Sequence, residues 1–129
     1  MIAALEWHSG EVAKRSEIKV NFSTDMPETD IPVATATGIF RIYQELLTNA
    51  VRHANANVIT SSLQLKDNQI ILKIEDDGQG MDLAINRTKK TLGLIGIKER
   101  TFALGGKFDL KSESGKGTKV QISIPYEQH

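Results

Sequence analysis

Apolar residues recur along the chain in two periods, one of three to four residues and one of two, so both helices and strands are predicted. The longest helical pattern is expected to begin at a capping Thr35 or Thr37 and to run to about Ala54. Its buried stripe is predicted to consist of Ile39, Ile42, Tyr43, Leu46 and Ala50.

Two shorter helices are predicted on either side of this long one. Residues 2–15 are expected to form the first, with Ile2, Leu5 and Val12 at buried positions. The second is predicted over residues 94–104, ending at the glycine pair that follows, because glycine is the residue most often found just past a helix C-terminus.

Strict alternation of apolar and polar residues predicts strands in the rest of the chain. Asp67 and Asn68 separate two of them and predict a tight hairpin turn. A further pair is expected to be joined by a turn at residues 114–117. The strands are predicted near residues 18–22, 57–65, 69–76, 107–112 and 118–124. The predicted fold class is α+β, a two-layer α/β sandwich in which a mostly antiparallel sheet packs against helices.

Composition narrows the function further. The chain has 129 residues, which suits one domain over residues 1–129, and 16 basic side chains balance 16 acidic ones. This balance argues against partners chosen by net charge, so neither nucleic-acid binding nor direct membrane contact is expected. No apolar run has the length of a membrane span, and cysteine is absent, which suits a cytoplasmic protein without thiolate metal sites.

A polar row accompanies the apolar stripe of the long helix. Glu45, Asn49, Arg52 and His53 are spaced i, i+4, i+7 and i+8, which places them along one edge of that helix. The carbonyl oxygen of Asn49 is a hard ligand that suits Mg²⁺, and Arg52 can neutralise phosphate. An ordinary solvated helix face is the alternative interpretation of this row.

Two strands place polar side chains where the core is expected. Asp76 is in phase with the apolar residues of its strand, and an inward carboxylate is costly unless a donor such as an adenine amino group satisfies it. Alternatively, Asp76 opens a glycine-rich turn. Gly78 and Gly80 are expected either to let the backbone approach a ligand or to adopt positive φ. Thr118 is in phase with the apolar residues of the last strand, where it either bonds adenine or is simply a β-branched strand residue.

The segment before the last helix is rich in glycine and lysine. Residues 77–92 show no clear period and are interpreted as a mobile loop. Gly93 and Gly96 are expected at the start of the helix, where bare backbone suits a phosphate group, with Lys89 and Lys90 nearby. Close packing of the helix through Gly96 is the alternative.

Taken together, four segments in this order resemble the motifs of one family. Residues 44–54 match the N box, residues 76–81 and 93–100 match two glycine boxes, and residues 112–118 match the closing segment of the ATP-binding catalytic domain of sensor histidine kinases. That domain has the Bergerat fold shared with DNA gyrase B, Hsp90 and MutL. The resemblance covers nearly the whole chain, and the second glycine box looks most like the subfamily of nitrate and lipid-fluidity sensors.

The resemblance implies a magnesium–ATP site. Asn49 would coordinate Mg²⁺, with Glu45 near the metal or its water as the candidate catalytic residue. Arg52 would face the phosphates and His53 the nucleotide. Asp76 would accept the adenine amino proton, with Thr118 nearby. The residues implied to shape the remainder of the pocket and lid are Gly78, Gly80, Lys89, Lys90, Gly93, Leu94 and Gly96.

The same resemblance implies transfer of the ATP γ-phosphoryl group to a histidine on an upstream dimerisation domain, with a response regulator as a later partner. This sequence contains no such upstream segment, and His8 lacks the flanking charges expected of an acceptor. The chain is therefore expected to hold ATP without phosphorylating itself. The parent protein would be cytoplasmic or anchored in the bacterial inner membrane.

Three other functions fit parts of the pattern. A stand-alone serine kinase of the anti-sigma-factor type has this fold and a similar length. A hydrolytic ATPase of the gyrase or MutL type would use Glu45 as the base for water. A degenerate nucleotide-binding or interaction module would have the fold without the chemistry, although the presence of Asn49, Asp76 and the glycine boxes argues against it.

Overall fold

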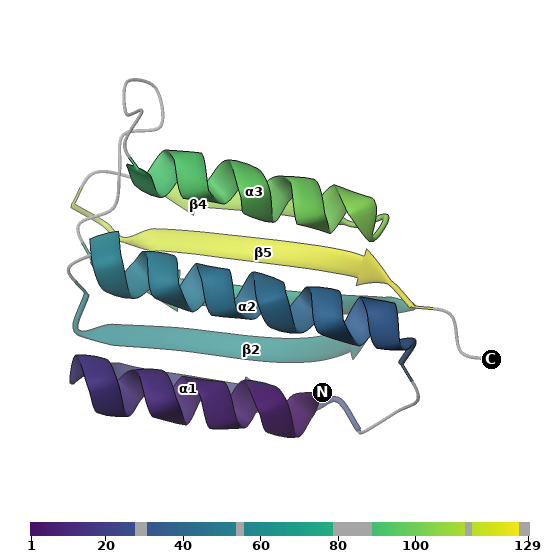
Figure 1. Cartoon of the computed structure of the whole chain (residues 1–129), viewed down its shortest axis with the longest axis horizontal. Helices are drawn as coiled ribbons and strands as arrows, with labels where there is room; N and C mark the ends of the chain where they lie inside the picture. Colours follow the sequence, from purple (N-terminus) through teal and green to yellow (C-terminus); the bar gives the residue numbers. More distant parts are fainter. Residues whose placement is uncertain (28–30, 54–55, 79–88, 113–114, 127–129) are drawn as a thin grey trace.

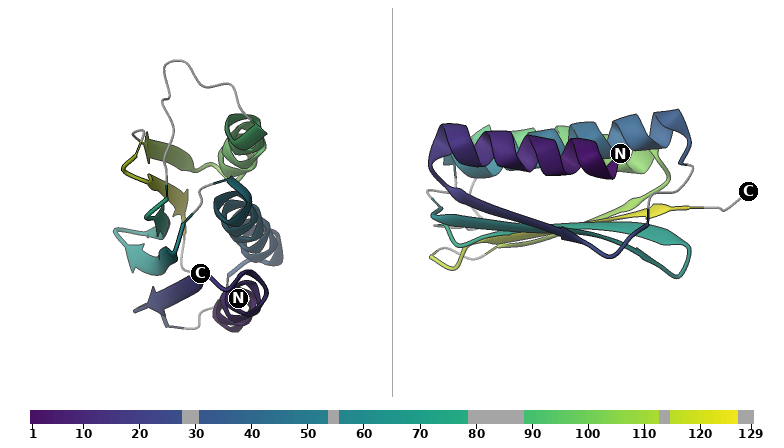
Figure 2. Two further views of the ribbon diagram at one scale, coloured as in Figure 1. Left: turned by 90° about the vertical axis from the view of Figure 1, so that its left-hand side faces the viewer. Right: turned by 90° about the horizontal axis from the view of Figure 1, so that it is seen from below.

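The molecule has two layers, a sheet and a set of helices that lie together on one of its faces (Figures 1 and 2). The helices are α1 (Ile2–Ser16), α2 (Val33–His53) and α3 (Lys89–Ala103). The computed structural model describes residues 1–27, 31–53, 56–78, 89–112 and 115–126, with the backbone alone for residues 53 and 89–93.

The sheet is five-stranded, in the order β1-β2-β3-β5-β4. Strands β1 and β2 run parallel, and the other neighbouring pairs run antiparallel. The predicted α+β fold with a mostly antiparallel sheet is therefore confirmed. The strands are β1 (Lys19–Thr24), β2 (Val58–Lys66), β3 (Gln69–Asp76), β4 (Lys107–Ser112) and β5 (Thr118–Pro125).

The hairpin between β2 and β3 turns where the sequence predicts it. Asp67 and Asn68 both adopt positive φ, at 52° and 58°, which is the backbone of a type I′ turn. Such a turn twists in the same sense as the strands it joins and so fixes their register. In that register Ile59 lies opposite Asp76, at the far end of the hairpin.

The core lies between the two layers. The whole predicted stripe of α2 is buried, together with Leu47, which the sequence pattern did not single out. From α1, Ile2 and Leu5 are buried as predicted, whereas Val12 is only partly buried. The sheet contributes the alternating residues of its inner face, which are continuous with the same cluster. None of the helices in the described part of the chain combines the length and apolarity that a bilayer crossing requires.

The start of α2 differs from the prediction. The helix begins at Val33, so Thr35 and Thr37 lie inside it and do not cap it. The carbonyl of Pro32 accepts the first helical hydrogen bond, from the N–H of Ala36 at 3.0 Å. Proline fixes a φ that is compatible with helix entry, so the helix begins directly behind it without a threonine cap.

The start of α3 also differs. The helix begins at Lys89, so residues 89–92 are helical instead of forming part of a loop, and Gly93 and Gly96 lie in the helix interior. Residues 79–88, the remainder of the predicted mobile loop, are outside the described part of the chain. Glycine lowers helix propensity by about 1 kcal/mol relative to alanine but does not forbid a helix, and burial of Leu94 and Ile97 stabilises this one.

The end of α3 agrees with the prediction. Gly105 has a φ of 75°, and its N–H donates to the carbonyl of Phe102 at 2.9 Å. The N–H of Gly106 donates to the carbonyl of Thr101, also at 2.9 Å. These two bonds form a Schellman motif, the usual way in which glycine ends a helix.

His8 is part of the packing between α1 and α2. Its ring makes edge-on contacts with Phe40 and Tyr43, at centroid distances of 5.9 Å and 6.3 Å. Its Nε2 atom is buried and has no hydrogen-bond partner among the described residues. Burial, and secondarily the charge of Arg15, lower the pKa of His8. A ring packed in this way is poorly placed to receive a phosphoryl group, which agrees with its lack of acceptor flanks.

Candidate functional site

A small cavity lies at one end of the molecule, between the two layers. It is formed where α2 and β3 end and where β5 begins, with the N-terminal half of α3 on the same side (Figure 1). Three of its residues come from α2, two from β3, two from β5 and one from α3. They are Leu46, Asn49, Ala50, Ile74, Asp76, Leu94, Thr118 and Val120. Each of the four motif segments thus contributes to one cavity.

Asp76 is the acidic residue of this cavity. It lies on the inner face of β3 with Ile74, as its phase predicts, and it is 8% exposed. Its Oδ1 accepts a hydrogen bond from the N–H of Gly78 at 2.9 Å. Asp76 therefore opens the turn with one contact and also lines the cavity, while its contact with adenine stays a prediction. A buried carboxylate favours further donors, because each one offsets the cost of burying its charge.

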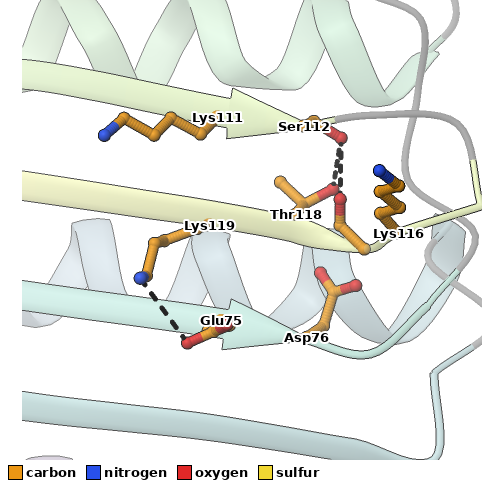
Figure 3. Close-up of a pocket in the computed structure, with 8 residues that line it drawn as sticks. Glu75, Asp76, Lys111, Ser112, Lys116, Thr118 and Lys119 are labelled. Atoms are coloured by element: carbon orange, nitrogen blue, oxygen red, sulfur yellow. Dashed lines mark hydrogen bonds and ion pairs between the residues drawn. The ribbon is translucent and has the colours of Figure 1, made fainter.

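Thr118 is the direct cross-strand neighbour of Asp76. It is 7% exposed, and its hydroxyl lies 2.9 Å from the hydroxyl of Ser112 on β4 (Figure 3). The hydroxyl of Ser112 also donates to the carbonyl of Gly117 at 3.1 Å. Ser112 has only one hydroxyl proton, so when it donates to Gly117 the proton between the two hydroxyls comes from Thr118.

Asn49 brings an amide to the same cavity from the opposite layer. It is half-buried on α2 and lies between Leu46 and Ala50 in the sequence. Asn49 and Asp76 therefore line the same cavity, together with apolar residues. This juxtaposition of a strand carboxylate and a helix carboxamide is the central expectation from the sequence, and the structure agrees with it.

Glu45 and Arg52, two of the other polar residues predicted on α2, lie outside this lining. Glu45 makes an ion pair with Arg100 of α3, in which Oε1 lies 3.0 Å from Nη2. Arg52 is exposed on the last turns of α2. The side chain of His53 is outside the described part of the chain.

The predicted helix start at the second glycine box is wrong, whereas a phosphate contact at Gly93 and Gly96 stays a prediction. Gly93 is inside α3, and its first turn is built from residues 89–92. A side chain added at Gly96 would meet no atom within 4 Å, so that glycine does not mediate close packing either. The side chains of Lys89 and Lys90 and the whole of Gly80 are outside the described part of the chain.

Asp77 has a structural role that sequence reasoning missed. Its Oδ1 accepts hydrogen bonds from the backbone N–H groups of Asn57, at 2.8 Å, and Val58, at 3.0 Å. These bonds, led by the one from Val58, lower the pKa of Asp77. Asp77 thereby ties the start of β2 to the end of β3, directly beside Asp76. An adjacent pair of aspartates at a strand end is a signal that one faces inward while the other caps the neighbouring strand.

Gly117 is a second missed residue. It has a φ of 83°, and a side chain added there would lie 2.2 Å from the backbone oxygen of Asp76. The chain entering β5 therefore passes so close to the end of β3 that only glycine fits. This approach places Thr118 opposite Asp76.

A second hollow of about 190 Å³ lies next to Asp76 and Thr118, among the strand ends drawn in Figure 3. Lys111 and Lys119 are cross-strand neighbours there, and Lys119 also pairs with Glu75 at 4.0 Å. Basic and acidic side chains are mixed in this lining, so its chemistry does not select one ligand class. Its residues are Glu75, Asp76, Lys111, Ser112, Lys116, Gly117, Thr118 and Lys119.

Comparison with known proteins identifies the class to which this fold and cavity belong. Residues 34–128 match the family model described as histidine kinase-, DNA gyrase B- and HSP90-like ATPase. The chain belongs to this family of ATP-binding domains. The relatives it resembles place it with the histidine kinases in that family.

The sensor histidine kinase LiaS of Bacillus subtilis is 32% identical over 111 residues, which are 86% of this chain and 31% of LiaS. The sensor histidine kinase ComP of the same organism is 33% identical over 125 residues, which are 96% of this chain and 16% of ComP. This chain therefore spans about a third or less of these relatives.

A solved structure agrees with these relatives. The blue-light activated histidine kinase EL346 of Erythrobacter litoralis superposes with a TM-score of 0.80 at 27% identity. The match covers 97% of this chain and 41% of that one. These comparisons do not test the subfamily, so the resemblance to nitrate or lipid-fluidity sensors stays a prediction.

Replacement of Gly117 by alanine tests the close approach of β5 to β3. Gly117→Ala should lower the free energy of unfolding by at least about 2 kcal/mol, because the new methyl group meets a backbone oxygen that cannot turn aside. Gly115→Ala is the matched control, since Gly115 has nearly the same φ, 81°, but open space around it. That control should cost about 1 kcal/mol. Equal losses for the two variants in urea denaturation would contradict the account.

Proposed function

We propose that this chain binds magnesium–ATP in the cavity between α2 and the ends of β3 and β5, and that it serves as the phosphoryl donor of a two-component sensor kinase. The observation that carries the proposal is the shared lining of Asp76 and Asn49. An adenine-binding carboxylate and a magnesium-binding carboxamide must belong to one site in such an enzyme.

The polar and apolar residues of the cavity suit the adenine end of a nucleotide. The carboxylate of Asp76 and the hydroxyl oxygen of Thr118 can accept hydrogen bonds at the edge of a purine. Ile74, Val120 and Leu94 supply apolar surface for its faces. In this structure the cavity contains about 20 Å³, enough for a single water molecule, so adenine enters only when the walls separate.

The residues also suit a magnesium ion that is held mainly by its substrate. In the described part of the chain, no cluster of three or more His, Cys, Asp or Glu side chains could hold a metal. Mg²⁺ commonly keeps several waters and binds one or two protein oxygens together with phosphate oxygens. The side-chain oxygen of Asn49 fits that role, and the ion would neutralise charge on the transferred phosphoryl group.

The proposed reaction needs a histidine from another domain. A ring nitrogen of that histidine attacks the γ-phosphorus, the bond to the bridging oxygen breaks, and ADP leaves while a base beside the histidine takes the ring proton. This chain contributes binding and orientation, which account for most of the catalysis in phosphoryl transfer. The named relatives support a histidine acceptor and not the serine of an anti-sigma-factor kinase.

The partners follow from the same proposal. The acceptor histidine would lie on a dimerisation domain upstream in the parent protein, and a response regulator would receive the phosphoryl group next. The parent would place this domain in the cytoplasm, whether or not it is anchored in the inner membrane. The extra length of LiaS and ComP supports such a parent.

Asp76→Asn tests the adenine end of the site. The variant should bind ATP about tenfold to a hundredfold more weakly, because one carboxylate now accepts the Gly78 N–H and would also accept the adenine amino group. The matched control is Asp109→Asn, which removes an exposed carboxylate from β4. Isothermal titration calorimetry measures both variants, and equal affinities for ATP would rule out Asp76 as the adenine acceptor.

Asn49→Ala tests the metal end. Loss of the amide oxygen should bring the affinity for ATP in the presence of Mg²⁺ close to that measured in a chelator, while adenosine affinity changes by less than about threefold. Thr48→Ala, an exposed position on the same helix, serves as the control and should keep the magnesium dependence of the wild type. If Asn49→Ala also keeps it, the metal is not held by this side chain.

A further inference from the structure

An ion pair joins the two helices that border the candidate site. Oε1 of Glu45 on α2 lies 3.0 Å from Nη2 of Arg100 on α3, with side-chain exposures of 38% and 43% respectively. Within the described part of the chain, this is the sole ion pair found between helices. Glu45 precedes Asn49 by one helical turn, so the two side chains emerge as neighbours on α2.

The pair belongs to a set of contacts that fix how α3 lies along α2. At one end, Leu104 just after α3 packs directly on Gly38, where an added side chain would lie 2.7 Å from the leucine Cδ1. At the other end, Leu94 shares the cavity lining with Ala50. Residue numbers increase along α2 while those of their partners on α3 decrease, so the two helices are antiparallel (Figure 1). The ion pair is a polar contact between the two ends.

We propose that Arg100 is a positioning residue for the triphosphate end of the nucleotide, acting through Glu45. This inference rests on the proposed function and deepens it. Arg100 neutralises a carboxylate that would otherwise lie uncompensated one turn from Asn49. The role assigned to Glu45 is then the anchor for Arg100, in place of the expected role near the metal or its water.

The charges involved predict the direction in which nucleotide affinity should change. ATP carries its negative charge on the phosphates, and an uncompensated carboxylate at Glu45 would repel them. Removal of the arginine should therefore lower the affinity for nucleotides in proportion to their phosphate charge and leave the affinity for adenosine unchanged. Removal of both charged groups should abolish the repulsion, so the second substitution should rescue the first.

Titration of the whole chain with ATP, ADP and adenosine in the presence of Mg²⁺ tests these expectations. Arg100→Gln should lower the affinity for ATP about three- to tenfold and the affinity for ADP by less. The affinity for adenosine should change by less than about twofold. The Arg100→Gln, Glu45→Gln double variant should regain ATP affinity to within about twofold of the wild type. Glu45→Gln alone should bind ATP at least as tightly as the wild type does.

The matched control for lost charge is Lys98→Gln. Lys98 is another exposed basic residue of α3, and it lies over the ring of Phe102, 5.8 Å from the centroid, and not beside Glu45. This variant should keep wild-type affinity for all the ligands.

Three results would overturn the proposal. The first is an equal loss of ATP and adenosine affinity in Arg100→Gln, which would indicate a purely structural pair. The second is no rescue in the double variant, and the third is a weaker ATP complex in Glu45→Gln alone. If the wild type binds adenosine but the variants show none of the predicted differences in affinity, only the positioning role is refuted. A wild type that binds no adenine compound refutes the proposed function itself.

Discussion

The backbone register between β3 and β5 is the constraint on which the rest of the site depends. It sets Asp76 opposite Thr118 and turns both side chains toward the helices. Because side chains alternate with a period of two, a slip of one residue in either strand would turn that residue to the open face of the sheet. Gly117 permits this register by allowing β5 to approach β3 closely, and Asp77 separately ties the start of β2 to the end of β3. These backbone features, more than any single ligand contact, make the site possible.

Features that depend on nearby residues were predictable from the sequence. The buried face of α2, the turn at Asp67 and Asn68, and the inward direction of Asp76 each follow from local periodicity or turn chemistry. The beginning of α3 was not predictable in this way. Its glycines lower the local helix propensity, and the burial of Leu94 and Ile97 against the rest of the fold decides the outcome. The same holds for α2, whose start is set by Pro32 and not by a threonine cap.

The residues of the candidate site were likewise predictable only where the signal lies in nearby sequence. Asn49 and Asp76 were each identified from their own segment, and their shared cavity followed from the family resemblance. The partner of Glu45 was not identified, because Arg100 lies far away in the sequence and only the packing of α3 on α2 brings them together. The two layers thus have separate tasks in this account. The ends of β3 and β5 would recognise the base, and α2 and α3 would position the groups near the phosphates.

The central claim is that Asp76 recognises the amino group of adenine inside this cavity. The most direct measurement compares the wild-type chain's affinity for ATP with its affinity for purine riboside triphosphate, which carries hydrogen in place of that amino group. The account predicts that ATP binds about tenfold more tightly or better, since a hydrogen bond to a buried carboxylate is lost in the analogue. Equal affinities for the two triphosphates would contradict it.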